Sequence, residues 1–458
     1  MTSPDIEAWA HIRDAVFEVV VLTQRGNDLW SLPTIPRELG DDWALPESPE
    51  SEIRSHEAFG HSSITVSFNA LTALAAVTGD KHPRSTNATL AAIETRRGRH
   101  GGYGSPSERM YDDTVNAVPR HTAMAAVAQL VFSAAADLAV HLQPSMKWLL
   151  DKQKKSGGWS YDWSRQSLRL GSQSTASAIC ALCLYAELPG APREIVRRSS
   201  SAVAKAYAGL LRCECDGVWQ GKDDGVPERF EVRDAAFVIR LLRLADRSGT
   251  LSRMISDDSE TIEDLVARLS GRLRQAGWPA TRDSTAPDVI ASISVLHLMG
   301  ETGGRASLDD ELLHSVEQAI LATWRNGELA ARMTAWDWQC LALLAAQRAG
   351  PMDATAIRNA NARLASVRSA WLSRKLRTAD LTRLDVTARE SLTFAMTEGR
   401  GLRKRSARER LAVAAKRLGK LTVEHVWAMI VGLVVLLLSY QFFGQNLPDF
   451  LRDMLTGE

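Results

Sequence analysis

Pairs of acids and pairs of cysteines are the residues of this chain whose types could bind a metal ion. The acidic pairs lack the third carboxylate that a DDxxD magnesium site needs, and the cysteine pairs lack a second pair or a histidine at zinc spacing. We therefore expect no metal and no cofactor. These pairs are Asp223 with Asp224, Asp257 with Asp258, Asp309 with Asp310, Cys180 with Cys183, and Cys213 with Cys215.

A second group of functional side chains stands at the starts of helices predicted from their alanine and leucine content. Capping and solvation explain such residues one at a time. As a group, their guanidinium, imidazole, carboxylate and indole groups could hold an anionic or amphipathic ligand. The candidate ligand-binding residues are His61, Arg120, His121, Arg233, Asp234, Asp288, Trp336 and Asp337.

The elements that carry these residues recur along the chain. Each unit is a turn with an aromatic residue, usually beside glycine, then a polar loop, then a helix rich in small residues, and the units follow one another at about sixty residues. The helices after the turns are apolar around most of their circumference, whereas the helices before them are charged on one face. Six such helical hairpins can form an open solenoid or a closed ring. The turns contain Trp43, Tyr103, Trp159, Trp219, Trp278 and Trp324.

Two of these turns carry a recognisable motif. The segment QKKSGGW has the QxxxGxW pattern, and CECDGVW repeats it with cysteine in place of glutamine. The chain therefore resembles the squalene and oxidosqualene cyclases over roughly residues 40 to 350, and more distantly the β subunits of protein prenyltransferases. The resemblance implies an all-α, (α/α)6 toroid of six helical-hairpin repeats. It also implies structural roles for Gln153, Gly157, Trp159, Gly217 and Trp219.

The same resemblance indicates where catalytic groups would be expected. Class II terpene cyclases protonate an alkene with the middle acid of a DxDD motif, which needs a carboxylic acid kept protonated. No intact DxDD occurs: MYDDT has Met110 in place of the first acid, and EVRDA has Arg233 in place of the proton donor. The zinc site of the prenyltransferases is incomplete because Val218 occupies its cysteine position. The weak candidates for an unrecognised catalytic acid are Asp112, Asp234 and Asp288.

A further feature is the uncharged apolar run Val426 to Gly444. At about 1.5 Å rise per residue this run spans a bilayer core of roughly 30 Å. The segment Arg400 to Lys420 before it is strongly basic, so we expect a single-pass helix with the bulk of the protein cytoplasmic and the tail outside. Its basic residues would contact anionic lipid headgroups, and we expect no nucleic acid to bind. Five cysteines without a disulfide framework fit a reducing compartment.

These features predict a domain order and three functions. We favour a membrane-anchored toroid that is not catalytic and binds a lipid-like or anionic ligand, or a protein partner, at the cytoplasmic face. One alternative is an active isoprenoid cyclase or prenyl-transferring enzyme; another is a sensor of a bacterial defence or signalling system that acts through its transmembrane helix. The predicted order is an N-terminal helical segment (1–40), the toroid (41–350), a helical connector (351–400), a basic juxtamembrane helix (401–425), the transmembrane helix (426–444) and a short extracytoplasmic tail (445–458).

Overall fold

The computed structural model divides the chain into two units, Met1–Gly399 and Arg400–Glu458. The second unit lies wholly outside the described residues, and with it lie the predicted basic segment and apolar run. His61 and Asp112 are outside them as well. The described residues are 3–23, 64–79, 83–104, 117–160, 171–219, 231–256, 259–273, 277–300, 310–326, 329, 333 and 335–372.

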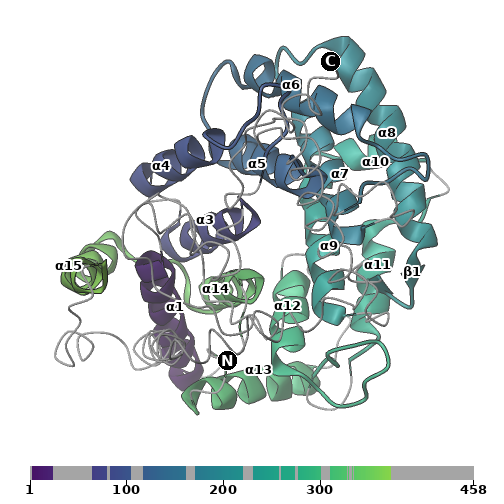
Figure 1. The fold of residues 1–458 in the computed structure, drawn as a ribbon. Coiled ribbons are helices and arrows are strands. Elements are labelled where there is room, and N and C mark those ends of the chain that lie inside the picture. Colours follow the sequence, from purple (N-terminus) through teal and green to yellow (C-terminus); the bar gives the residue numbers. More distant parts are fainter. Residues whose placement is uncertain are drawn as a thin grey trace, which may run out of the picture. The chain divides into compact units, whose positions relative to one another are not determined.

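Six helices of the first unit pack side by side in a closed order, which can be followed in Figure 1. Each packs against the next along the chain, and the last packs against the first, so the described helices form a ring and not an open solenoid. The all-α toroid predicted above is confirmed. We call the space that these helices enclose the ring interior. The inner helices are α3 (Ile64–Thr78), α5 (Pro119–Phe132), α7 (Ser172–Ala186), α9 (Val232–Asp246), α12 (Val289–Gly300) and α14 (Ala335–Ala349).

A second set of helices packs on the outside of this ring. Several of them lie against the inner helices that flank them in the chain: α6 packs on α5 and α7, and α11 packs on α9 and α12. Local signals start some of them: α11 begins with a capping box between Thr261 and Asp264. These helices are α4 (Pro83–Glu94), α6 (Leu138–Asp151), α8 (Arg193–Arg212), α10 (Thr250–Met254), α11 (Ile262–Ser270) and α13 (Asp310–Arg325).

The turns between outer and inner helices repeat one hydrogen-bond pattern. The indole N–H of Trp159 donates to the carbonyl oxygen of Leu149 at 2.8 Å, and Trp219 and Trp278 make the equivalent bonds to Leu210 and Leu269 at 2.9 and 3.0 Å. In each case the accepting carbonyl belongs to the outer helix before the turn, so the tryptophan fixes the path of the chain into the next inner helix. Strands β1 (Glu214–Cys215) and β2 (Val218–Trp219) form a short antiparallel pair at one such turn.

The remaining residues of the motif hold the same turn. The side-chain amide of Gln153 donates to the carbonyl oxygen of Ala202 at 2.8 Å and to that of Gly157. Gly157 has φ +104°, and a Cβ at this position would lie 2.6 Å from the carbonyl oxygen of Lys205. These contacts join the turn to helix α8.

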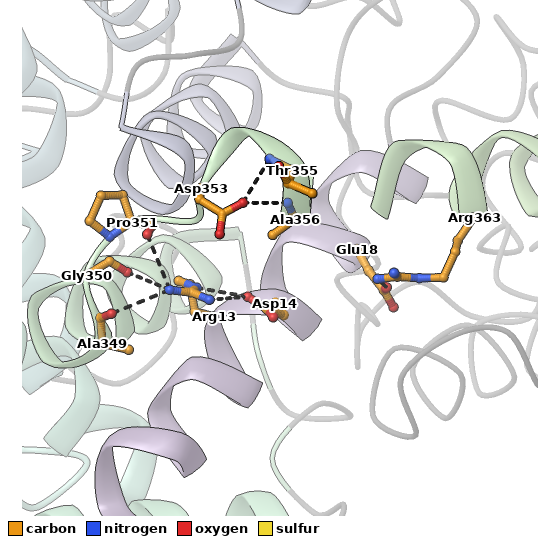
Figure 2. Close-up of polar contacts among 10 residues, drawn as sticks. All are labelled: Arg13, Asp14, Glu18, Ala349, Gly350, Pro351, Asp353, Thr355, Ala356 and Arg363. Carbon is orange, nitrogen blue, oxygen red and sulfur yellow. Dashed lines mark hydrogen bonds and ion pairs between the residues drawn. The ribbon is translucent and has the colours of Figure 1, made fainter. Parts of the chain in front are cut away.

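The ring is completed by helix α1 (Ser3–Thr23), which packs against α14, α3 and α15 (Ala354–Leu372). The guanidinium of Arg13 lies 2.9 Å from the carbonyl oxygen of Gly350 and within 3.5 Å of those of Ala349 and Pro351, at the end of α14 (Figure 2). On the same helix the buried carboxylate of Glu18 accepts from Arg363 of α15 at 2.8 Å. The first helix of the chain thus caps the last inner helix.

The described residues contain neither a membrane-spanning helix nor a metal-binding cluster. No helix in that part of the chain is both long and apolar enough to cross a bilayer. Those residues also contain no group of three His, Cys, Asp or Glu side chains that could hold a metal ion.

Candidate functional site

The first turns of the inner helices meet in the ring interior. Arg120 of α5, Arg233 of α9 and Trp336 of α14 each occupy the second position of their helix. Pro119 begins α5, where the missing proline N–H costs nothing and its fixed φ suits the first helical position. The equivalent positions at the starts of these three inner helices therefore carry side chains of different chemistry. We call the following residues the interior cluster: Arg120, Glu231, Arg233, Asp234, Phe237, Trp336 and Asp337.

Ion pairs in the interior cluster join helices that are not neighbours. The guanidinium of Arg233 donates to the carboxylate of Asp337 at 3.3 Å and to that of Glu231 at 3.0 Å. Helix α12 lies between α9 and α14 in the ring order, so the bond from Arg233 to Asp337 crosses the interior. Asp337 is fully buried, and the guanidinium of Arg233 compensates part of the cost of burying its charge.

Aromatic side chains form the second part of the interior cluster. The rings of Phe237 and Trp336 meet edge to face with centroids 4.9 Å apart, and His297 of α12 lies 5.8 Å from Trp336 in a similar arrangement. The guanidinium carbon of Arg120 lies 5.7 Å from the centre of the Phe237 ring, a cation–π distance. Groups from α5, α9, α12 and α14 therefore meet at one place.

Burial and charge act differently on the ionisable groups of this cluster. Burial raises the pKa of Asp234 to about 6; Glu231 adds to the rise, while Arg233 and Arg120 oppose it. For Arg233 burial lowers the pKa, but the carboxylates of Asp337, Asp234 and Glu231 outweigh that effect and raise it. At neutral pH the Arg233 guanidinium is charged, and the raised pKa of Asp234 means that its carboxyl group takes up a proton more readily than an ordinary aspartate.

His297, two helical turns into α12, is held as a neutral imidazole. An arginine only donates, so the bond of 2.6 Å between Arg240 Nη1 and His297 Nε2 makes Nε2 the acceptor. The ring proton then sits on Nδ1, which donates to the carbonyl oxygen of Ser294 at 2.9 Å. Burial lowers the pKa of His297 far below its ordinary value, and the charge of Arg240 adds to this shift.

The candidate residues named from the sequence divide into three groups. Arg120, Arg233, Asp234, Trp336 and Asp337 come together in the interior cluster. His121 is buried in the first turn of α5, and Asp288 acts as a helix cap, because its carboxylate accepts from the backbone N–H of Ala291 at 2.9 Å. His61 and Asp112 lie outside the described residues.

Sequence reasoning missed Phe237 and His297. Phe237 follows Arg233 by four residues and so lies on the same face of α9, a spacing that could have identified it. His297 is two turns into α12, and no pattern in the sequence indicates that its imidazole reaches Trp336 of another helix.

The closed ring of inner helices, the outer layer and the tryptophan turns define the fold as an α/α toroid. No family model and no curated protein matches the chain. Among solved structures it is similar to a type II terpene cyclase from Scytonema in complex with geranylgeranyl dihydroxybenzoate, with 13% identity, a TM-score of 0.43, and coverage of 76% of this chain and 99% of that chain.

A second similar structure is a glycosidase, with 7% identity, a TM-score of 0.49, and coverage of 77% of this chain and 100% of that chain. A third is a protein from Actinoplanes, with 13% identity, a TM-score of 0.41, and coverage of 75% of this chain and 99% of that chain. Similarities at this level carry no argument about activity. The assignment of the ring rests on the packing order of its own helices.

Proposed function

We propose that this chain binds a lipid-like ligand inside the ring and holds it at a membrane without transforming it. The observation that carries the proposal is the indole of Trp336, which is turned toward other inner helices and whose N–H has no hydrogen-bond partner among the described residues although the side chain is buried. An unpaired buried donor costs about 1 to 3 kcal/mol. A ligand atom that accepts from this N–H would remove the cost.

The surroundings of Trp336 suit an apolar chain beside a polar group. The Trp336 ring meets Phe237 and His297 edge to face, and both supply aromatic surface. The next residue on α14, Asp337, is already paired with Arg233 of α9. The ion pair engages the Asp337 carboxylate with an arginine of this chain. These pairings support binding without chemistry.

The test compares two buried tryptophans that differ in the direction they face. Trp336 faces the interior, whereas Trp324 of α13 packs against Trp338 on the outer side of α14 with ring centroids 6.3 Å apart. Full-length wild type, Trp336→Leu and Trp324→Leu would be purified in detergent and their bound lipids measured by native mass spectrometry. We expect both variants to lose stability by roughly 1 to 4 kcal/mol and only Trp336→Leu to lose a specific lipid. Equal lipid content in all three samples would contradict the proposal.

The membrane part of the proposal rests on the sequence of the second unit. The uncharged run Val426 to Gly444 and its basic flank Arg400 to Lys420 support a single-pass anchor with the ring on the cytoplasmic side. In membrane fractionation we expect the full chain to resist carbonate extraction and a chain lacking residues 426–458 to be released. A tag at the C-terminus should be digested by external protease only where the outer face is exposed; protection of that tag in intact cells would overturn the orientation.

A second candidate function is supported by Asp234. Burial raises the pKa of Asp234 to about 6, and the residue lies one helical turn before Phe237, whose ring meets Trp336. An acid-catalysed isoprenoid cyclisation requires a carboxylic acid kept protonated. Cyclisation is an isomerisation, so incubation with a linear polyprenol or squalene would produce compounds of unchanged mass and altered chromatographic retention. Products that appear with wild type and not with Asp234→Asn would establish this function in place of passive binding.

A further inference from the structure

We infer that the ligand group bound inside the ring is electrically neutral and carries both hydrogen-bond donors and acceptors, as hydroxyl, ester and amide groups do. This inference rests on the proposed function, because it names the chemical class of ligand for the same ring interior. It is carried by a set of buried polar side chains on α3 and α14 that have no hydrogen-bond partner among the described residues. On the interior side these are the hydroxyl of Thr65, the amide oxygen of Asn69, the indole N–H of Trp336 and the amide of Gln339, and on the outer side of α14 the indole N–H of Trp338.

On α14 the interior groups Trp336 and Gln339 share one helical face, whereas the unpartnered indole of Trp338 packs on Trp324 at the outer side. Trp336, Gln339 and Gln347 are separated by three and eight residues, which places them along one stripe of the helix. Both ends of the stripe contact α12: Trp336 packs on the imidazole of His297, and Gln347 lies 3.5 Å from its carbonyl oxygen. Gln339 lies between them, fully buried, and neither its amide oxygen nor its amide nitrogen has a partner in the described part of the chain.

On α3 the unpartnered groups face the ring interior. Helices α1, α4, α5 and α14 pack around α3, so the side that remains is the one toward the interior. Thr65 and Asn69 are four residues apart and lie on the same face as Thr72 and Ala76, whose side chains are partly exposed. Because α3 and α14 are neighbours in the ring, the hydroxyl of Thr65 and the amide oxygen of Asn69 border the same interior as Trp336.

The chemistry of these groups indicates what they would bind. Thr65 and Gln339 can each donate and accept, the Asn69 oxygen accepts, and the Trp336 N–H donates. None of the four carries a charge. The charged residues nearby are three arginines, Arg120, Arg233 and Arg240, and three carboxyl groups, Glu231, Asp234 and Asp337, so no cation is left in excess for an anionic ligand. A neutral group with donors and acceptors would satisfy the unpartnered atoms without introducing an unpaired charge.

The experiment uses two probes with the same acyl glycerol, one neutral and one with an anionic phosphate group. Full-length protein in detergent would be titrated with 1-oleoylglycerol and with 1-oleoylglycerol 3-phosphate, and binding would be measured by native mass spectrometry and thermal unfolding. The variants are Gln339→Met, which keeps the length of the side chain and removes the amide, and the double variant Thr65→Val with Asn69→Leu. Gln347→Met, two turns further along α14 and exposed, is the matched control.

We expect 1-oleoylglycerol to bind wild type at least tenfold more tightly than its phosphate, and Gln339→Met to lose at least tenfold in that affinity while Gln347→Met does not. Without probe, Gln339→Met should unfold at the wild-type temperature or above it, because an unpartnered buried amide has been removed. A lower unfolding temperature without probe, combined with wild-type binding, would show that the amide supports the fold through bound water and would overturn the inference.

The two proposals fail in different ways. If the phosphate probe binds as well as the neutral one, or binds independently of Gln339, the inference on charge is wrong while ligand binding in the ring stands. If neither probe binds and no lipid copurifies with wild type, the proposed function fails and the inference fails with it.

Discussion

Asp234 is the carboxyl group beside Arg233 whose pKa burial shifts. Asp337 and Glu231 accept hydrogen bonds from that guanidinium, whereas burial raises the pKa of Asp234 to about 6 from an ordinary value of 3.8. The folded protein therefore binds a proton at Asp234 that the unfolded chain has released, between about pH 4 and 6. This carboxyl group lowers stability as the pH rises through that window.

Replacing Asp234 by asparagine should remove this dependence. We expect the unfolding temperature of Asp234→Asn, relative to wild type, to be higher at pH 7.5 than at pH 5, because the wild-type group is ionised and poorly solvated only at the higher pH. Calorimetric scans at both values would measure the difference. A relative stability that is the same at pH 5 and pH 7.5 would show that Asp234 is solvated in the folded protein.

His297 should contribute a pH dependence of opposite sign. Its folded pKa is far below the unfolded value, so its stabilising effect is complete above about pH 6.5 and declines as the pH falls and the unfolded chain gains a proton. In His297→Gln we expect the loss of unfolding free energy between pH 6.5 and 5 to be smaller, by up to about 1.4 kcal/mol per pH unit. A chemical denaturation series would measure this slope, and an unchanged slope would place the proton on His297 in the folded state too.

At the scale of elements, the tryptophan turns were predictable and the interior cluster was only partly so. Gly157, Trp159 and the residues between them act within one turn, so their pattern is visible in a short stretch of sequence. The contact of Phe237 with Trp336 joins helices about a hundred residues apart, and its geometry depends on the curvature of the whole ring. The starts of the inner helices could be predicted from the repeat. The side chains that meet across the ring could not.

Two glycines offer a direct comparison of local backbone strain and close packing. Gly157 and Gly190 both have positive φ, but a Cβ on Gly157 would meet the carbonyl oxygen of Lys205, whereas one on Gly190 would meet nothing within 4 Å. We expect Gly190→Ala to cost about 1 to 2 kcal/mol and Gly157→Ala roughly 1 to 3 kcal/mol more, since α8 must shift away from the turn. Urea unfolding of both variants measures the difference. Equal costs would mean that α8 is loosely packed there.

At the scale of the whole ring, α1, which carries no motif, covers the junction between the last and first inner helices. Its apolar face, with Trp9, Ile12 and Val16 fully buried, docks beside α14, and Arg13 caps the end of that helix. The sequence predicted an N-terminal helical segment but not its partner, because an apolar helical face can dock on many surfaces. The six hairpins could be counted from the repeat, but the docking of α1 beside α14 could not be predicted from it.

The cap can be tested with a single substitution. Arg13→Ala leaves the carbonyl oxygens at the end of α14 without their charged donor, and we expect a loss of about 1.5 to 3 kcal/mol together with faster hydrogen exchange in α1 and the last turn of α14. Arg197→Ala, which breaks an exposed pair with Glu194, is the control and should cost less than about 1 kcal/mol. Uniformly faster exchange in all helices would indicate that the ring opens as one unit.

The position of α1 also affects how the protein is made. Arg13 and its acceptor Ala349 are separated by 336 residues, so at about 5 to 20 residues per second a ribosome needs roughly 20 to 70 s to synthesise the partner of a helix that has already emerged. During that time the side chains of Trp9, Ile12 and Val16 have no docking surface on α14. The nascent chain would therefore depend on a chaperone for longer than a chain whose first helix packs on its immediate neighbour.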